Sequence, residues 1–299
     1  MLPTVTLLRS NEMSNETKAC QLTSIQIISS DCIEHNFEQI IEQLDALSLD
    51  PEINHLVLLP ENALCFGNRN NYLLKAEMLG DGNVQHRLAE LAKTYACTLI
   101  CGSFPIKSEQ QDKIYTTCLV YSPQGVLLAH YHKIHLFDAD VEDAQGAYRE
   151  SGTFIPGDQV KVVDCGFVKV GLAICYDLRF PGLFQQLREQ GAEIIILPAA
   201  FTQVTGKAHW QALLQARAIE TQCYLLAANQ GGVHFAHQPE HATRYTYGHS
   251  MIVNAWGEVI GQLTTGNGSV QADFALQDVN QIRKKMPVQQ HNRFNSFYK

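Results

Sequence analysis

Short, almost wholly apolar runs recur along this chain, and their alternation with amphipathic segments restricts the fold more than any other feature. The runs HLVLLPEN (55–62), CTLICGS (97–103) and EIIILPAAF (193–201) have the composition of strands that are buried on both faces of a sheet. The segments EHNFEQIIEQLDAL (34–47) and VQHRLAELAKTYA (84–96) place their apolar residues on one helical face. A β-α-β-α-β order of this kind predicts a layered α/β domain with helices outside the sheets.

The sheets are expected to be mixed, because the alternation changes after Lys113. The stretch IYTTCLVYSPQGVLLAHYHK (114–133) has two β-rich runs around Ser-Pro-Gln-Gly, a turn signal that predicts a hairpin. A weakly periodic segment follows from 134 to 158, and a loop of that length inside a compact domain is usually functional or disordered. We find no linker, low-complexity tract or fixed repeat, so we expect one domain.

The bulk composition excludes several classes of protein. Of the 299 residues, 45% are hydrophobic and 17% are charged, which is typical of a soluble globular protein. The formal net charge of −8 argues against a nucleic-acid or acidic-membrane partner, because phosphate groups attract a basic face. The sequence also contains no run of about 18 apolar residues that would span a membrane.

Cysteine usage indicates a reducing compartment, and we therefore expect a cytoplasmic protein. The nine cysteines are an odd number, and they are scattered through apolar segments without the dense spacing of a secreted disulfide framework. Residues 1–18 lack the basic start, long apolar core and small-residue cleavage site of a signal peptide. We interpret them as a loose extension before a domain that occupies residues 19–299.

The stretch from Val168 to Leu187 predicts a strand, a sharp turn and a helix, with Cys175 at the end of the strand. An apolar, β-branched run stops at this cysteine, and apolar residues recur at helical spacing after Pro181. A thiol at such a junction lies near the positive end of a helix, where a thiolate is stabilised. The alternative is that Cys175 is a small hydrophobic residue of the core.

Two further polar residues stand where buried strands end. Glu61 follows HLVLLP, and Lys133 follows VLLAHYH. Ligands of open α/β sheets bind at the carboxyl ends of the strands, so these residues and Cys175 are expected to converge there. Cys175 would then be the nucleophile and Glu61 the proton acceptor, with Lys133 and the backbone N–H of Tyr176 near the developing oxyanion. Singly, Glu61 could bind a backbone amide and Lys133 could be a surface charge.

Histidine and cysteine spacing gives little support for a metal site. The densest histidines are His130, His132 and His135, and the first two share a face of the expected strand. No pair of cysteines at C-x-x-C spacing and no H-E-x-x-H motif accompanies them. Cys97 and Cys101 also share a strand face, and we assign them to the core. We therefore do not expect a metal ion.

Three segments together resemble the signature blocks of the nitrilase, or carbon–nitrogen hydrolase, superfamily. They are LPEN around Glu61, HKIHLFD around Lys133 and GLAICYDLRFP around Cys175, and their order and spacing are also similar. The resemblance runs from about residue 19 to the end of the chain. It implies an α-β-β-α sandwich of two mixed sheets with outer helices, cofactor-free catalysis through a cysteine thioester, and a homodimer or higher homo-oligomer.

The resemblance also implies roles for individual residues. Glu61 corresponds to the general base, Lys133 to the lysine that stabilises the oxyanion, and Cys175 to the nucleophile. Glu150, in YRESGTFIPGD, corresponds to a second glutamate, with a positioning role toward Lys133 and the substrate amide. The chain departs from the pattern by one extra residue between Lys133 and Glu150, and by Gly182 where many relatives have glutamate.

Within the superfamily, three segments most resemble the Nit branch, and in particular its deaminated-glutathione amidases. The segments are AFTQVTGKAHWQALLQARAIETQCYLLAANQGG, YGHSMIVNAWGEV and RKKMPVQQHNR. Such enzymes cleave an amide of deaminated glutathione to release 2-oxoglutarate and cysteinylglycine, a metabolite-repair reaction. The alternative is an ω-amidase that acts on 2-oxoglutaramate or 2-oxosuccinamate, and a different class of alternative is a catalytically silent scaffold.

Both kinds of amide have a keto-acid end, so a cationic contact is expected in the pocket. The candidates are Arg179, Arg244 and His249, although both arginines could instead form structural ion pairs. Tyr176 and Phe201 complete the expected substrate-binding residues. The long loop around Glu150 and the segments after Phe201 are expected to select the amide.

Overall fold

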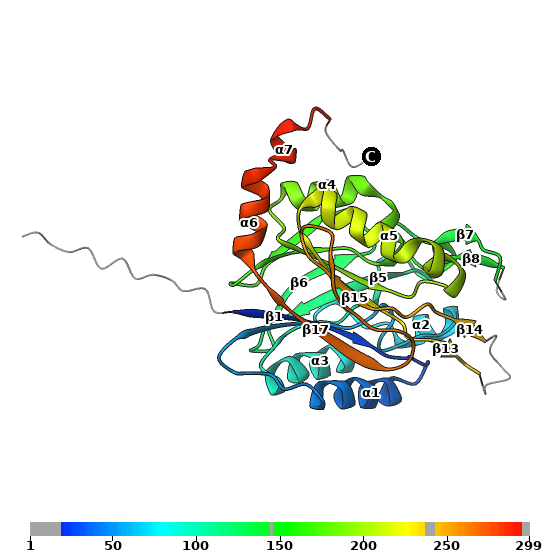
Figure 1. Ribbon diagram of the computed structural model, residues 1–299. Helices are drawn as coiled ribbons and strands as arrows, with labels where there is room; N and C mark the ends of the chain where they lie inside the picture. Colours follow the sequence, from blue (N-terminus) through cyan, green and yellow to red (C-terminus); the bar gives the residue numbers. More distant parts are fainter. Residues whose placement is uncertain (1–18, 144–145, 237–242, 295–299) are drawn as a thin grey trace, which may run out of the picture.

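The protein is a sandwich of two β-sheets that lie face to face between layers of helices (Figure 1). The structure is a computed structural model, and it describes residues 19–143, 146–236 and 243–294. The expected extension at residues 1–18 lies outside the described residues. The α-β-β-α arrangement of two mixed sheets confirms the fold predicted from the sequence.

The first sheet is built around three parallel strands with antiparallel strands on both sides. β1, β2 and β3 run parallel, and β17 and β5 pair antiparallel with the outer two. The order across this sheet is β17 (Gly268–Phe274), β1 (Cys20–Gln26), β2 (Asn54–Leu58), β3 (Thr98–Ile100), β5 (Ile114–Tyr121) and β4 (Phe104–Lys107), with β6 (Leu127–His132) also paired to β5.

The second sheet repeats this plan. Its parallel strands are β10, β11 and β12, and β9 and β15 pair antiparallel on either side of them. The order across this sheet is β16 (Val259–Gln262), β15 (Met251–Val253), β12 (Tyr224–Asn229), β11 (Ile194–Ala199), β10 (Lys169–Leu172) and β9 (Lys161–Asp164).

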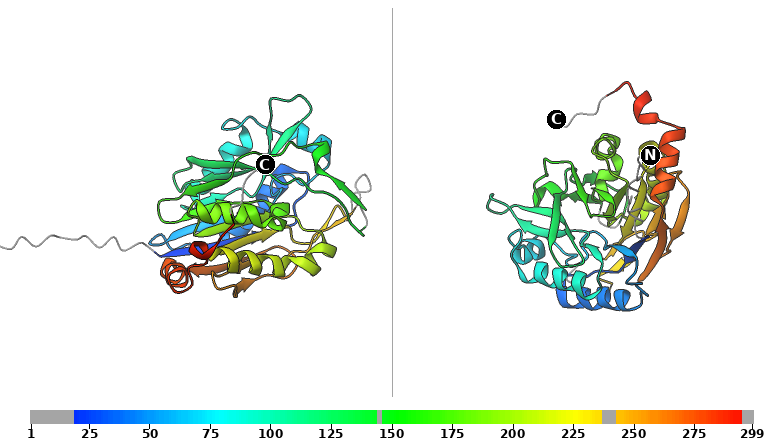
Figure 2. Two further views of the ribbon diagram at one scale, coloured as in Figure 1. Left: turned by 90° about the horizontal axis from the view of Figure 1, so that it is seen from above. Right: turned by 90° about the vertical axis from the view of Figure 1, so that its left-hand side faces the viewer.

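Helices cover the outer face of each sheet. The first sheet is covered by α1 (Ile33–Asp45) and α3 (Asn83–Thr94), and the second by α4 (Pro181–Glu189) and α5 (Gln203–Thr221). The right-hand view of Figure 2 shows α1 in blue below the sheets and α4 in green above them. The chain continues into α6 (Leu276–Lys285) and α7 (Val288–His291). None of the helices in the described ranges is long and apolar enough to cross a membrane.

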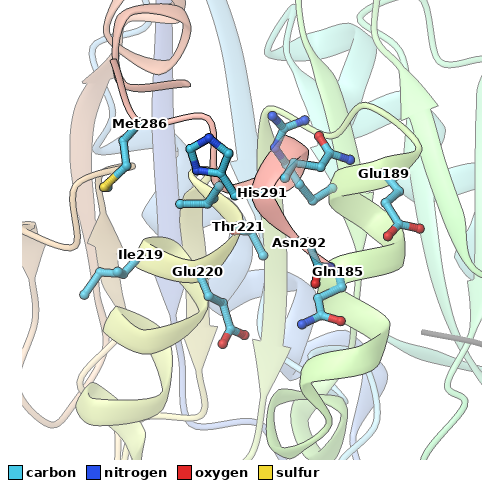
Figure 3. Close-up of a pocket in the computed structure, with 11 residues that line it drawn as sticks. Gln185, Glu189, Ile219, Glu220, Thr221, Met286, His291 and Asn292 are labelled. Atoms are coloured by element: carbon cyan, nitrogen blue, oxygen red, sulfur yellow. The ribbon is translucent and has the colours of Figure 1, made fainter. Parts of the chain in front are cut away.

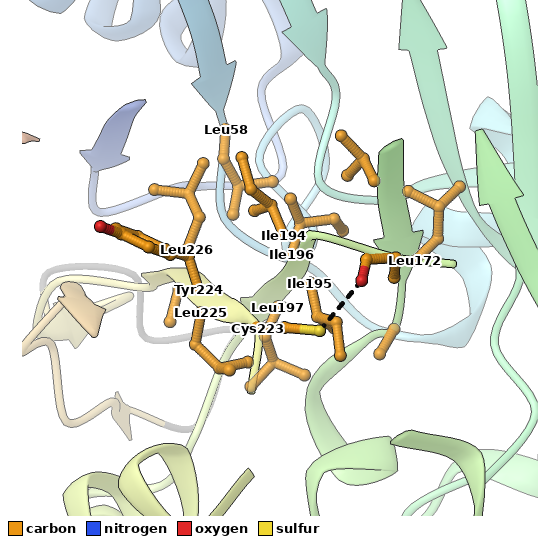
Figure 4. Packing of buried hydrophobic residues seen from close by; sticks show 14 of the residues in the cluster. Leu58, Leu172, Ile194, Ile195, Ile196, Leu197, Cys223, Tyr224, Leu225 and Leu226 are labelled. Carbon is orange, nitrogen blue, oxygen red and sulfur yellow. Dashed lines mark hydrogen bonds between the residues drawn. The ribbon is translucent and has the colours of Figure 1, made fainter. Parts of the chain in front are cut away.

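Alternate residues of the buried strands face the opposite sheet or the outer helices, as strand geometry requires. In β11, Ile194 and Ile196 point toward Leu58 of the first sheet, whereas Ile195 points toward the helices (Figure 4). All four side chains are fully buried. Because both faces of β11 are covered, its sequence is a continuous apolar run and shows no alternation.

Two small antiparallel sheets project from the same end of the sandwich (Figures 1 and 2). One pairs β7 (Asp138–Asp140) with β8 (Ala147–Arg149), and the other pairs β13 (Val233–His234) with β14 (Arg244–Tyr245). The segment from 134 to 158, which we expected to be a long loop, therefore contains a β-arm. Its strands carry no apolar alternation, so the sequence pattern did not reveal them.

Sequence reasoning also missed two short elements. The helix α2 (Arg69–Lys75) has too few residues to show helical periodicity, and Asn68 starts it by accepting a hydrogen bond from the backbone of Asn71. The strand β4 contains Pro105, which cannot donate a hydrogen bond to a neighbouring strand. The structure places β4 at the edge of the first sheet, where this proline is tolerated.

Candidate active site

The structure brings Glu61, Lys133 and Cys175 together at one edge of the sandwich. β6 is antiparallel to β5, which is antiparallel to β3, so β6 runs in the same direction as β2. The carboxyl ends of β2 and β6 therefore meet at one edge, and β10 delivers Cys175 to it from the second sheet.

Lys133 is the centre of the cluster. Its Nζ donates to Glu61 Oε1 at 2.8 Å and to both carboxylate oxygens of Glu150 at 2.9 Å. The lysine side chain is 1% exposed, and burial alone would lower its pKa. The two carboxylates outweigh burial and raise the pKa of Lys133 well above its ordinary value, so the amine stays charged.

Hydrogen bonds to the main chain of Glu61 and of the next residue hold Glu61 in place. Gln230, at the end of β12, donates from Nε2 to the carbonyl oxygen of Glu61 at 2.8 Å. The next residue, Asn62, has a φ of 58° and donates its N–H to Ser103 Oγ at 2.8 Å. Glu61 is thereby fixed from both sheets, because Gln230 follows a strand of the second sheet and Ser103 follows β3 of the first.

Glu150 reaches Lys133 from the end of the β-arm. It begins a 3₁₀ turn over Glu150–Gly152, directly after β8. Its Oε2 accepts the backbone N–H of Phe137 at 2.6 Å, in addition to its contacts with Lys133. A carboxylate that accepts three such hydrogen bonds is held in one orientation, as the positioning role implied by the resemblance requires.

Cys175 lies at a sharp bend and not at the start of a regular helix. β10 ends at Leu172, a 3₁₀ turn spans Cys175–Arg179, and α4 begins only at Pro181. The φ of Cys175 is 47°, in the left-handed region that costs a residue with a Cβ about 1–3 kcal/mol. The bend is therefore maintained by the surrounding contacts.

Asp177 supplies many of these contacts. One carboxylate oxygen accepts the Ile174 N–H and the Tyr131 hydroxyl, both at 2.8 Å. The other lies 3.0 Å from the backbone nitrogen of His135 and 2.7 Å from its Nδ1. The carboxylate is fully buried. It joins the bend at Cys175 to the two segments on either side of Lys133.

The thiol environment differs from the sequence-based expectation. We expected a helix terminus to stabilise a thiolate, but burial and the neighbouring Glu61 raise the pKa of Cys175 well above its ordinary value. Lys133 opposes this shift without cancelling it. Burial beside Glu61 therefore favours the neutral thiol form of Cys175 over the thiolate.

A cavity of about 290 Å³ opens beside these four residues. It is lined by Glu61, Asn62, Gly67, Asn68, Arg69, Tyr72, Lys133, Phe137, Tyr148, Arg149, Glu150, Thr153, Phe154, Cys175, Ala200, Thr202 and Arg244. The lining mixes charged groups with aromatic rings, which is typical of a site that orients a small polar ligand. We call this space the inner cavity.

Of the expected substrate contacts, Arg244 lines the inner cavity and the other four do not. Arg179 lies over the rings of Tyr176 and Phe201, with its guanidinium carbon 5.9 and 5.4 Å from their centroids. His249 stacks on Tyr247, and its carbonyl oxygen accepts the indole N–H of Trp210. Substrate binding by all five residues, including Arg244, stays a prediction.

Sequence reasoning missed Arg69, Tyr72 and Tyr148 in the cavity wall. Arg69 and Tyr72 belong to α2, and Tyr148 belongs to β8, so both of their elements were also missed. The available signal was the run NRNNY (68–72), which follows the block LPEN (59–62) after five residues. It has no periodicity, and only the folded chain shows that it faces the cavity.

The histidine cluster has other partners. His132 stacks on Tyr115 with ring centroids 3.9 Å apart, and its Nδ1 lies 2.8 Å from the hydroxyl of Thr117. Burial lowers the pKa of His132 to about 4. Across the described ranges, no group of three or more histidine, cysteine or acidic side chains is arranged to hold a metal ion.

Another cavity, of about 540 Å³, lies away from the cluster of Glu61, Lys133 and Cys175. It is found between α4, α5 and the C-terminal helices (Figure 3). Its wall includes Glu189, Ile219, Met286 and His291. None of Glu61, Lys133 and Cys175 contributes to it. Cavity size therefore does not identify the active site, whereas the arrangement of reactive groups does.

The fold and the inner cavity together define a hydrolase that acts on carbon–nitrogen bonds other than peptide bonds. The chain belongs to the carbon–nitrogen hydrolase family, whose model matches residues 20–284. This confirms the superfamily that the three sequence blocks resemble.

Individual relatives place the chain near the Nit branch. It is 46% identical over 280 residues to a protein of Yersinia enterocolitica named deaminated glutathione amidase, covering 93% of this chain and 95% of that protein. A Synechocystis protein with the same name is 37% identical over 91% of this chain and 97% of its own length.

Among solved structures, the NitFhit protein of C. elegans has a TM-score of 0.80 and 32% sequence identity. The match covers 92% of this chain and 65% of the NitFhit chain, so the present chain spans less than two thirds of that protein.

Proposed function

We propose that this protein hydrolyses the amide bond of deaminated glutathione to 2-oxoglutarate and cysteinylglycine. The observation that carries the proposal is the 46% identity, over 93% of the chain, to a deaminated glutathione amidase. The cluster of Cys175, Glu61, Lys133 and Glu150 in one cavity supports it, because amide hydrolysis needs a nucleophile, a proton carrier and a positive charge.

In the first half of the proposed reaction, Cys175 Sγ attacks the amide carbonyl carbon while Glu61 accepts the thiol proton. The carbonyl π electrons move to oxygen, and Lys133 and the Tyr176 N–H stabilise the negative charge there. When the tetrahedral intermediate collapses, Glu61 returns the proton to the amide nitrogen. The C–N bond breaks, cysteinylglycine leaves as the amine, and a thioester to Cys175 remains.

In the second half, water takes the place of the leaving amine. Glu61 accepts a proton from the water, whose oxygen attacks the thioester carbon. Collapse of the second intermediate breaks the C–S bond, and the proton returns to the sulfur. The products are 2-oxoglutarate and the neutral thiol, so each cycle consumes one water and restores the resting enzyme.

Glu150 is a positioning residue in this scheme. Both of its oxygens bind Lys133 Nζ, so its carboxylate fixes the ammonium group between Glu61 and the cavity. Deaminated glutathione carries a carboxylate at each end, and Arg244 is the expected cationic contact that lines the cavity. We therefore place Arg244 in contact with one of the substrate carboxylates.

The substrate is tested by comparing kcat/KM for deaminated glutathione, 2-oxoglutaramate, a nitrile and an N-carbamoyl amino acid. The proposal expects deaminated glutathione to be the best substrate by a large ratio. A strong preference for 2-oxoglutaramate would instead identify an ω-amidase. Activity on none of the four would favour a scaffold that uses its surface to bind a partner.

The nucleophile is tested with Cys175→Ala and Cys175→Ser. Both variants should lose activity while keeping the far-ultraviolet circular dichroism of the wild type. Cys165→Ala is a matched control, because Cys165 lies outside the inner cavity. Full turnover by either Cys175 variant would rule out the thioester mechanism.

We further propose that the protein is cytoplasmic and forms a homodimer or a higher homo-oligomer. The resemblance to the superfamily supports the assembly, and the nine unpaired thiols suit a reducing compartment. Light scattering after size-exclusion chromatography measures the assembly directly. A monomer at micromolar concentration would contradict this part of the proposal.

A further inference from the structure

A second cavity adjoins the inner cavity at the end of the sandwich that carries the two small sheets. It has a volume of about 220 Å³ and shares Tyr148 and Arg244 with the inner cavity. Val204, at the start of α5, and Thr243 and Tyr245, on the β14 segment, form other parts of its wall. We call this space the outer cavity.

The walls of the outer cavity are anchored to the core. An isolated β-bridge joins Thr202, the N-cap of α5, to Thr246, which follows β14. The Thr246 hydroxyl accepts the Gly232 N–H at 2.9 Å and lies 2.9 Å from His234 Nε2. Because Thr202 also lines the inner cavity, the bridge fixes the position of one cavity relative to the other.

The guanidinium groups of the inner cavity differ in their partners. Arg149 forms an ion pair with Asp140 at 2.7 Å. Arg69 donates to the carbonyl oxygens of Asp112 and Gly152, and Arg244 lies over the ring of Phe66, 4.5 Å from its centroid. Neither Arg69 nor Arg244 forms an ion pair with a carboxylate in the part of the chain that the structure describes.

These two arginines also occupy different places. Arg69 lines only the inner cavity, whereas Arg244 stands on the wall that the two cavities share. The carboxylate of Asp143 in the outer cavity accepts the Tyr148 hydroxyl at 2.8 Å. The outer cavity thus offers a guanidinium together with the apolar surfaces of Val204 and Tyr245, which are each 47% exposed.

We propose that the outer cavity is the binding site for the leaving dipeptide, and that Arg244 binds its terminal carboxylate. Arg69 then faces the keto-acid carboxylate within the inner cavity. This inference rests on the proposed function, since it assigns the two ends of the same substrate. A dipeptide leaving group extends several bonds beyond the scissile nitrogen and would occupy such a neighbouring space, whereas ammonia from an ω-amidase substrate would not.

The charge assignment is tested with two substrates that differ only at the leaving end. Deaminated glutathione has a terminal carboxylate, and its C-terminal amide is neutral there. The wild type should prefer the acid by roughly tenfold or more in kcat/KM, because a charge-assisted hydrogen bond is lost with the amide. Arg244→Gln should remove this preference, whereas Arg69→Gln should lower both values by a similar factor and preserve it.

The steric assignment is tested with Val204→Trp, which fills the outer cavity from an exposed position and is not expected to disturb folding. The ratio of kcat/KM for deaminated glutathione to that for 2-oxoglutaramate should fall at least tenfold. Val126→Trp is the matched control, because Val126 is 57% exposed and lies in the turn between β5 and β6. It should leave the ratio unchanged.

The outcomes separate this inference from the proposed function. If the wild type prefers 2-oxoglutaramate, the proposed function is wrong, and calorimetric titration with cysteinylglycine still tests the cavity. Binding that weakens in Arg244→Gln and in Val204→Trp supports the subsite. If Arg244→Gln lowers kcat/KM equally for the acid and its amide, or if Val204→Trp leaves the ratio unchanged, the subsite inference is wrong.

Discussion

At the scale of single residues, the proposed reaction begins from a neutral thiol, the form that burial favours at Cys175. Burial and Glu61 raise the pKa of Cys175, while Lys133 is held charged by two carboxylates. An attack that begins from a thiol needs a base in contact with it. Glu61 therefore has a role that a preformed thiolate would make unnecessary.

Glu61→Gln should lower kcat by roughly 10²- to 10⁴-fold, the usual contribution of a general acid or base. Steady-state kinetics with deaminated glutathione measure this change, and the exposed Glu109→Gln is the control. A kcat for Glu61→Gln within a few-fold of the wild-type value would contradict the assignment.

The buried His234 makes the free energy of unfolding depend on pH. Its ring is stacked on Phe66, with Nδ1 2.8 Å from the Ser29 carbonyl oxygen, and burial lowers its pKa from 6.5 to about 4. The unfolded chain therefore binds more protons than the folded chain between these pH values. The stabilisation is complete above the unfolded pKa and is lost as the pH falls toward about 4.

His234→Gln should consequently flatten the fall in stability between pH 6.5 and pH 4. One pKa unit corresponds to about 1.4 kcal/mol, so the fall in the free energy of unfolding over this range should differ between the two proteins by up to ~3 kcal/mol. Urea unfolding at several pH values measures the free energies of unfolding. His86→Gln, at an exposed position of α3, should behave as the wild type, and an equal slope for all three proteins would refute the assignment.

At the scale of elements, the bend at Cys175 and the end of β6 act as one unit because Asp177 joins them. Tyr131 and His135 lie on either side of Lys133 in the sequence. Both contact the buried carboxylate of Asp177. The geometry of the nucleophile and of the ammonium group is therefore coupled through a residue that lies outside the cavity wall. Asp177 is a positioning residue.

Asp177→Asn should destabilise the fold by about 3 kcal/mol, since an amide nitrogen cannot accept the donors that the carboxylate now satisfies. It should also lower kcat more than it raises KM, because Lys133 and Cys175 lose their relative position. Tyr131→Phe removes only one donor and should cost about 1 kcal/mol. Equal effects of the two variants, or an unchanged kcat in Asp177→Asn, would argue against the coupling.

At the scale of the whole molecule, the two sheets are held together by an apolar layer with a few buried polar contacts. Ile194, Ile196 and Leu58 meet in this layer (Figure 4), and Ser24 of β1 donates to the carbonyl oxygen of Ala227 in β12 at 2.8 Å. The catalytic cluster takes residues from both sheets. Separation of the sheets would therefore abolish stability and activity together.

Ile196→Ala should lower the free energy of unfolding by about 2–5 kcal/mol, because the fully buried side chain would leave a cavity between the sheets. Urea denaturation at a fixed protein concentration measures this change. Val126→Ala, on the exposed turn, should stay within about 0.5 kcal/mol of the wild type. A loss for Ile196→Ala as small as that for Val126→Ala would mean that the layer repacks freely.

The sequence alone was enough to predict the type and order of the long elements and the strand ends at which Glu61, Lys133 and Cys175 lie. Continuous apolar runs such as EIIILPAAF can be recognised as strands because a strand covered on both faces tolerates few polar residues. The three blocks were specific enough to indicate the family. Short elements such as α2 and the proline-containing β4 were not predicted, because they have too few residues to show a periodic pattern.

Which candidate arginine lines the inner cavity depends on the tertiary structure, and so does the raised pKa of the Cys175 thiol. Arg179 and Arg244 are equivalent in a sequence, but Arg179 lies over Tyr176 and Phe201, while Arg244 stands between the two cavities. The pKa of Cys175 depends on burial and on Glu61, which arrives from the other sheet. These properties follow from distances across the fold, and local sequence does not encode them.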